Sequence, residues 1–149
     1  MITIEGADQL ARLAKQLREA GAKDLQAELG KAINRALKPV KADIKRSAAE
    51  TLPKRGGLAA KVARSKITTR RRTSQKAAGV RVVATNTISL YHLDKGQIRH
   101  RKGGDINAGK VQPTTPGWMT KPAEAAAPKV QRELVQAMDD IAKKIVRGI

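Results

Sequence analysis

The chain has 149 residues and a formal net charge of +18, from 31 Lys and Arg against 13 Asp and Glu. That length fits one domain with a core of its own. So large a positive charge predicts a polyanionic neighbour, such as nucleic acid, an anionic membrane or an acidic protein surface. The absence of cysteine excludes disulfides and thiolate metal sites.

The hydrophobic pattern gives no sign of a targeting or membrane-spanning segment. No apolar run approaches the roughly 20 residues that a membrane span needs. The first residues, Met1–Gly6, lack the basic region and apolar run of a signal peptide. We therefore expect a protein that is soluble, is made in the cytoplasm and has no membrane partner.

Aromatic residues are almost absent, with no Phe and only Tyr91 and Trp118 of the larger rings. Ala, Leu, Ile and Val must then supply nearly all of the buried area. A core this thin is often completed by neighbouring subunits, so a homo-oligomer is one of the arrangements that the composition favours.

The first third, residues 1–53, predicts a short strand and two helices. Ile2–Ile4 alternates apolar and polar residues, as a strand does, and a helix is expected from Asp8 until Gly21 interrupts it. Pro39 predicts a kink near Arg35–Lys38 in the second helix, which ends at Thr51–Pro53. That helix has apolar residues at helical spacing: Leu25, Leu29, Ile33, Leu37, Val40, Ile44 and Ala48.

The middle third, residues 54–112, holds 15 of the Lys and Arg residues but only two acidic ones, Asp94 and Asp105. The β-branched residues within 61–72 and 79–93 predict two or three antiparallel strands. The tract 97–117 has no core pattern and predicts either a mobile loop or an extended basic hairpin arm.

The last part of the chain, residues 113–149, predicts a loop anchored by Trp118 and a closing helix. Pro122 suits the first turn of that helix, whereas Pro128 either kinks it or marks its true start. The helix has an apolar face formed by Val130, Leu134, Met138, Ile141 and Ile145. The expected fold is α+β in a single domain, 1–149: a small antiparallel sheet packed against a long kinked N-terminal helix and a C-terminal helix, with an extended basic loop or hairpin arm.

Catalytic chemistry has little support in these residues. His92 and Asp94 would share one face of a strand, but no third metal ligand stands at a useful spacing. Gly56 and Gly57 form a basic turn without the Lys-Ser/Thr pair of a phosphate loop. We therefore expect no enzyme, no catalytic residue, no metal and no cofactor; a nuclease or toxin-like domain would need a metal-dependent activity for which no residues can be named.

Nucleic-acid binding is the main alternative. Arg70, Arg71, Arg72 and the Arg99–Lys102 cluster could neutralise phosphates, which would give binding without sequence specificity. Proteins that bind single strands also need stacking aromatics, and only Tyr91 could serve here. A stand-alone basic protein that contacts phosphates is therefore an alternative function.

Three stretches, in this order, resemble the small head–tail joining and tail-completion proteins of long-tailed bacteriophages, a family that includes minor tail components and tail terminators. Leu52–Leu58 is similar to the family's "Pro, basic, Thr-Gly, x, Leu" turn after its main helix, with Gly56 in place of Thr. Leu90–Gly96 resembles its "Tyr-x-x-x-Glu-x-Gly" strand end, with Asp94 in place of Glu. Pro116–Ala123 resembles its "Pro-Phe-x-x-Pro-Ala" start of the last helix, with Trp118-Met119 near the Phe position.

The resemblance implies a structural virion protein at the head–tail junction, a tail terminator or tail-completion component. Copies would form a ring, expected to be hexameric, between the head connector or adaptor protein and the tail tube protein, and double-stranded DNA would pass through it unread. The residues expected on the DNA channel or on a subunit interface are Arg70, Arg71, Arg72, Arg99, Arg101 and Lys102. The residues expected to serve structure and assembly are Gly56, Gly57, Tyr91, Asp94, Gly96, Trp118 and Pro122.

Overall fold

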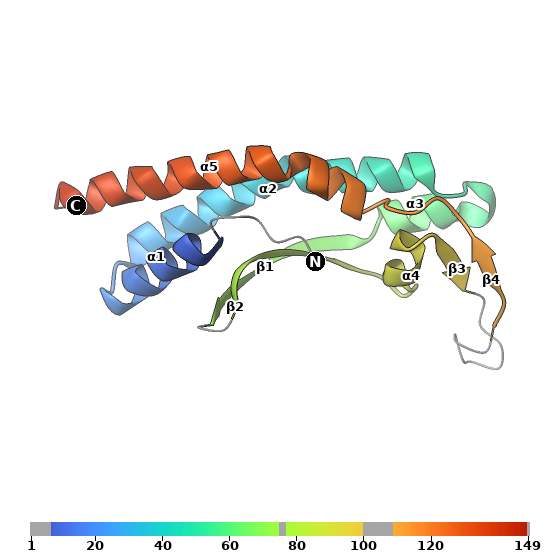
Figure 1. The fold of residues 1–149 in the computed structure, drawn as a ribbon, viewed down its shortest axis with the longest axis horizontal. Helices are drawn as coiled ribbons and strands as arrows, with labels where there is room; N and C mark the ends of the chain where they lie inside the picture. The colour runs from blue at the N-terminus through green and yellow to red at the C-terminus, as the bar shows by residue number, and fades with distance from the viewer. Residues whose placement is uncertain (1–6, 75–76, 100–108, 149) are drawn as a thin grey trace. The chain divides into compact units, whose positions relative to one another are not determined.

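The computed structural model describes residues 7–74, 77–99 and 109–148 (Figure 1). These residues form an α+β fold with a long helix near the N-terminus, two small two-stranded sheets and a C-terminal helix. The predicted fold class is therefore confirmed. The predicted strand Ile2–Ile4 lies outside the described residues.

The described residues form six helical elements and four strands. The helical elements are α1 (Ala7–Glu19), α2 (Lys23–Thr51), the 3₁₀ turn η1 (Arg55–Gly57), α3 (Leu58–Ala63), α4 (Leu90–Asp94) and α5 (Thr120–Val146). The strands are β1 (Lys66–Ser74), β2 (Ala77–Thr85), β3 (Gln97–Arg99) and β4 (Val111–Pro113). β1 pairs with β2, and β3 pairs with β4.

The described chain divides into two compact units, and neither is a continuous stretch of sequence. The first unit is formed by Met1–Pro39, Thr68–Val83 and Ala126–Ile149, and the second by Val40–Ile67 and Ala84–Ala125. The chain therefore passes from one unit to the other within α2, β1, β2 and α5.

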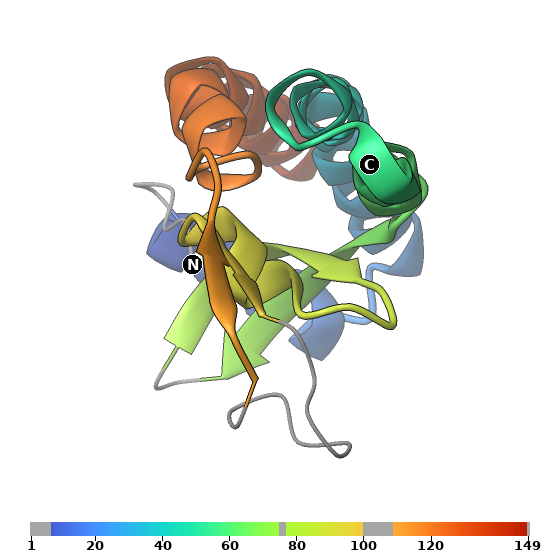
Figure 2. The same cartoon turned by 90° about the vertical axis from the view of Figure 1, so that its right-hand side faces the viewer.

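The first unit is built on two long helices, and its core is aliphatic. In this unit α2 and α5 run side by side in opposite directions (Figures 1 and 2). Apolar residues recur every three or four positions in both helices, and this spacing places them on one side of each helix. The buried residues are Leu17 of α1, Leu29, Ile33, Ala36 and Leu37 of α2, and Val130, Leu134 and Ile141 of α5.

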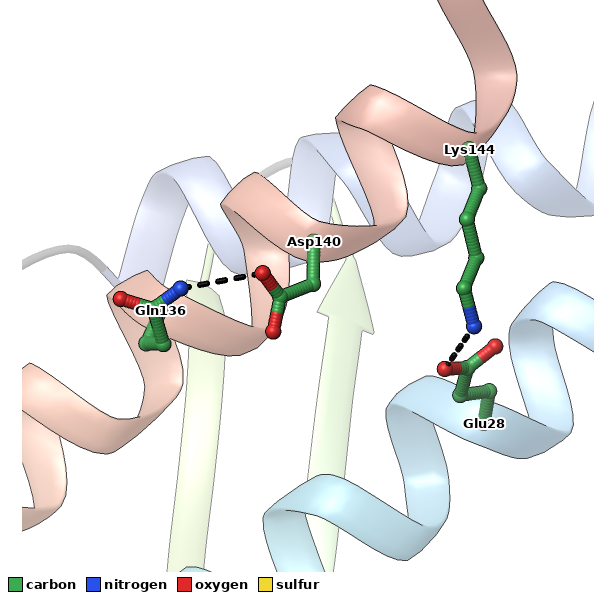
Figure 3. Close-up of polar contacts among 4 residues, drawn as sticks. All are labelled: Glu28, Gln136, Asp140 and Lys144. Carbon is green, nitrogen blue, oxygen red and sulfur yellow. Dashed lines mark hydrogen bonds and ion pairs between the residues drawn. The ribbon is translucent and has the colours of Figure 1, made fainter. Parts of the chain in front are cut away.

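An ion pair also joins the two helices of the first unit. The Lys144 ammonium of α5 donates to the carboxylate of Glu28 on α2, while the Asp140 carboxylate accepts a hydrogen bond from the Gln136 amide (Figure 3). In the predicted apolar face of α5, Ile145 is 46% exposed, so the buried part of the helix ends at Ile141.

The second unit contains the one large aromatic ring that is buried among the described residues. Trp118 is 1% exposed and shares this unit with other buried apolar residues. These are Val40, Ile44 and Ala48 of α2, Leu52 just after α2, Ala59 and Val62 of α3, Leu93 of α4 and Ala123 of α5. A single indole thus supplies the bulk that the missing phenylalanines would otherwise give.

Two predicted strand segments are helical instead. Lys61 and Val62, which we expected at the start of a strand, belong to α3, and β1 begins only at Lys66. The stretch Leu90–Asp94 forms α4. Both segments hold apolar residues three apart, Ala59 with Val62 and Leu90 with Leu93, and such spacing puts them on one helical face.

Neither of the two prolines inside the long helices begins or ends its helix. α5 starts at Thr120 and continues through Pro128, so Pro128 does not mark the start of the helix, and Pro122 lies in its first turn as predicted. α2 likewise runs from Lys23 to Thr51 through Pro39.

The two ends of the tract after Gly96 pair with each other as the base of a hairpin. β3 and β4 pair antiparallel, with Gln97 opposite Pro113, Ile98 opposite Gln112 and Arg99 opposite Val111. Of the two predicted forms, a hairpin is therefore correct at its base; residues 100–108 lie outside the described part of the chain.

Candidate assembly site around Asp94

Asp94 joins two of the stretches that carry the phage-family resemblance. It is the last residue of α4, and its Oδ1 accepts hydrogen bonds from the backbone amides of Met119, at 2.8 Å, and Thr120, at 3.1 Å. Its Oδ2 accepts a further hydrogen bond from the Thr120 hydroxyl. These amides belong to the start of α5, where a helix has donors without intrahelical partners.

The Asp94 carboxylate supplies a negative charge and a hydrogen-bond acceptor at the N-terminus of α5. The first turn of α5 contains no acidic residue. A negative charge beside the first amides of a helix is favoured by the helix dipole and satisfies those amides. Asp94 therefore caps α5 from a different part of the chain.

Backbone hydrogen bonds reinforce the same junction. The Gly117 amide donates to the Asp94 carbonyl at 2.8 Å, and the Thr114 amide donates to the Gly96 carbonyl at 2.9 Å. The side chain and backbone of Asp94-Lys95-Gly96 thus hold the segment that leads into α5. We call the set of residues Asp94, Gly96, Gly117, Trp118 and Thr120 the Asp94 junction.

Two glycines of the junction have positive φ angles, at +80° for Gly96 and +83° for Gly117. A Cβ on Gly96 would lie 2.8 Å from the Thr114 carbonyl oxygen, which real structures essentially never allow. Gly96 is therefore required both by its backbone conformation and by the close approach of Thr114.

Trp118 anchors the junction from inside. Its side chain is 1% exposed, and its Nε1 has no hydrogen-bond partner among the described residues. An unsatisfied buried donor costs about 1–3 kcal/mol, which the burial of the apolar part of the indole must offset.

The predicted sharing of a strand face by His92 and Asp94 is wrong, because both lie on α4. The His92 ring instead hydrogen-bonds to the hydroxyl of Ser89, which precedes the helix. A Ser–His pair is also found in hydrolases, but there the histidine is oriented by a third group. Here the Asp94 carboxylate is occupied by α5, and no group of three or more metal-ligating side chains lies within the described ranges.

Tyr91 lies on the surface of α4 and is 68% exposed. Its ring contacts the His92 ring edge-on, with centroids 5.4 Å apart, and the Lys95 ammonium lies 5.8 Å from its centroid. An exposed tyrosine flanked by a cation resembles the aromatic residues that dominate many protein interfaces.

The remaining predicted assembly residues form two turns of the second unit. Gly56 and Gly57 have φ angles of +72° and +73°, and nothing lies within 4 Å of a Cβ built on either. They turn the chain from the end of α2 into α3. Pro122 is half-buried in the first turn of α5.

The predicted basic residues are only partly described. Arg70 is exposed on β1. Arg71, Arg72 and Arg99 lie in strands, but their side chains are outside the described part of the structure, as are Arg101 and Lys102 entirely. The expected channel or interface role of these six residues stays a prediction.

Sequence reasoning missed two polar residues that organise the second unit. Thr120 binds Asp94 through both its amide and its hydroxyl. Asn86, which the sequence analysis did not single out, donates from Nδ2 to the Lys61 carbonyl at 3.0 Å and to the buried Ser65 hydroxyl at 2.8 Å. The preference of Asn for turns was the available signal, but it does not reveal a partner more than 20 residues away.

Comparison with protein-family models, curated proteins and solved structures finds no match for this chain. Within the described residues, no helix has the length and apolar character to cross a membrane.

Proposed function

We propose that the chain is a structural virion protein of a long-tailed bacteriophage, a tail-terminator or tail-completion component at the head–tail junction. Copies assemble into a ring between the head connector and the tail tube, and double-stranded DNA passes through its centre. The chain has no catalytic role in this proposal.

The observation that carries the proposal is the direct contact between two of the three family-like stretches, with the third in the same unit. Leu52–Leu58, Leu90–Gly96 and Pro116–Ala123 are far apart in sequence, yet all three belong to the second unit. Two of them are joined directly, because Asp94 binds Met119 and Thr120. This contact gives the two motifs a shared structural role at the start of α5.

The composition supports the same proposal. A ring is closed by head-to-tail contacts that each subunit makes with the next. The exposed Tyr91 and the β3–β4 hairpin base are features that such contacts can use. Positive charge also suits a protein through which DNA must pass.

The test is to inactivate the gene in the phage or prophage genome that carries it and to examine the particles by electron microscopy. We expect DNA-filled heads separated from tails, and recovery of joined particles when the wild-type gene is supplied in trans. Normal infectious particles without the protein would contradict the proposal.

The alternative, a stand-alone nucleic-acid-binding protein, makes the opposite prediction about location. Antibody labelling of purified particles should find the chain at the junction if the proposal is correct. If the chain is absent from particles and is recovered with cellular nucleic acid, the alternative is favoured.

A further inference from the structure

The β1–β2 ribbon is strongly cationic and has no acidic residue near it in sequence. Its part in the first unit, Thr68–Val83, contains five basic residues and no carboxylate, and the wider stretch 51–93 contains no Asp or Glu at all. The five are Arg70, Arg71, Arg72, Lys76 and Arg81. The ribbon therefore cannot neutralise its own charge.

Arg70 and Arg81 are the two ribbon cations whose side chains are described, and both are exposed. The ion pairs found among the described residues use other cations, namely Lys15, Arg46 and Lys144. Neither Arg70 nor Arg81 takes part in any of these pairs.

The two arginines also belong to one face of the ribbon. β1 and β2 are nine residues each and are separated by residues 75 and 76, so in an antiparallel pair Arg70 stands opposite Arg81. The bond from the Thr68 hydroxyl to the Val83 carbonyl, 3.5 Å long, fits this register. Like charges placed opposite each other destabilise a sheet unless an anion lies between them.

We propose that this face of the ribbon binds the phosphate backbone of double-stranded DNA through Arg70 and Arg81. The inference rests on the proposed function for the place where DNA is met. It names the β1–β2 ribbon as the part of the chain that contacts the DNA backbone. It also names Arg81, which the sequence analysis did not single out.

Phosphate suits the ribbon better than an acidic protein surface does. Four of its five cations are arginines, whose planar guanidinium groups bind phosphate oxygens in pairs. The centres of protein interfaces are enriched in aromatic residues, whereas Lys66–Thr85 contains none. The same lack of aromatics disfavours single strands, which are bound by stacking.

The experiment measures the affinity of the purified full chain for a short DNA duplex across a series of salt concentrations. Each phosphate contact contributes about 0.9 to the slope of log affinity against log salt. We expect the R70Q/R81Q variant to lose about 1.8 of the slope, from two contacts. An R70K/R81K variant keeps the charges and should keep the slope.

The matched control is R35Q/R132Q, which removes two exposed arginines from α2 and α5 in the same unit. It should leave the slope unchanged, and circular dichroism should show all variants folded. Equal losses in both Gln variants, or equally tight and salt-dependent binding of poly-glutamate, would overturn the inference. These results concern the isolated chain, so they are independent of whether particles form without it.

Discussion

At the scale of single residues, Asp94 shows how one carboxylate can connect distant parts of a chain. It lies 25 and 26 residues before the two residues whose backbone amides donate to it. The sequence around α5 therefore gives no sign that Asp94 caps this helix. Capping by a remote residue does more than end a helix, because it also fixes where that helix begins relative to α4. The junction therefore depends on this side chain more than its half-buried position suggests.

Replacing Asp94 by alanine should destabilise the fold by about 2 kcal/mol, the upper part of the range for loss of an N-terminal cap. Met119 and Thr120 would lose their acceptor. Urea unfolding measures the effect. Asp94→Asn should cost less, because asparagine also caps helices well.

The Thr120→Ala variant serves as a partner in a double-mutant cycle. Asp94 and Thr120 are in direct contact, so their effects on the free energy of unfolding should not add. Strict additivity would mean that the hydroxyl contact contributes nothing to the junction.

Glycines with positive φ should differ according to what surrounds them. Gly56→Ala meets only open space and should cost about 1 kcal/mol for its backbone conformation. Gly96→Ala has a similar φ but also meets the Thr114 carbonyl, so its cost should be larger by at least about 1 kcal/mol. Thermal unfolding of the two variants compares them, and equal losses would show that Thr114 moves away without cost.

At the scale of elements, the α2–α5 pair of the first unit combines an apolar seam with a peripheral ion pair. The seam is the stronger part, since burial of a side chain contributes far more than an exposed pair of charges. The Lys144 and Glu28 side chains remain 38% and 44% exposed, so water screens their attraction.

A double-mutant cycle on Glu28→Gln and Lys144→Gln should give a coupling energy of about 0.5 kcal/mol at low salt, falling toward zero in 1 M salt. Ile141→Ala, at a residue 1% exposed, should cost about 2–5 kcal/mol and should not respond to salt. Chemical unfolding at two salt concentrations measures both. A coupling that persists in 1 M salt would indicate a pair shielded from solvent.

The sequence identified the long helices because their apolar faces recur over many turns, as in Leu29, Ile33 and Leu37. It failed on α3 and α4, where five or six residues are too few for a period to be distinguished from strand alternation. β-branched residues such as Val62 and Ile88 then suggested strands.

Only three of the five residues of the Asp94 junction were singled out from the sequence, and none of their contacts was. The resemblance singled out Asp94, Gly96 and Trp118, yet nothing in their spacing says that Asp94 binds the start of α5. That contact depends on how the second unit packs, and Thr120 was missed for the same reason.

At the scale of the whole molecule, the net charge of +18 would oppose the proposed assembly of copies into a ring. Copies that approach one another repel unless anions lie between them. The proposed ring would bring several such chains together, so it needs either screening by salt or a polyanion. DNA in the channel would provide that polyanion.

We therefore expect the oligomeric state of the purified chain to depend on ionic strength. Near 10 mM salt the screening length is about 30 Å and monomers should dominate, whereas near 1 M it is about 3 Å and larger species should form. Sedimentation velocity measures this shift, with six times the monomer mass expected for a hexamer. A short DNA duplex should promote the same species at low salt. If neither high salt nor duplex raises the mass, charge repulsion is not what keeps the copies apart, and ring formation would require the tail or connector protein.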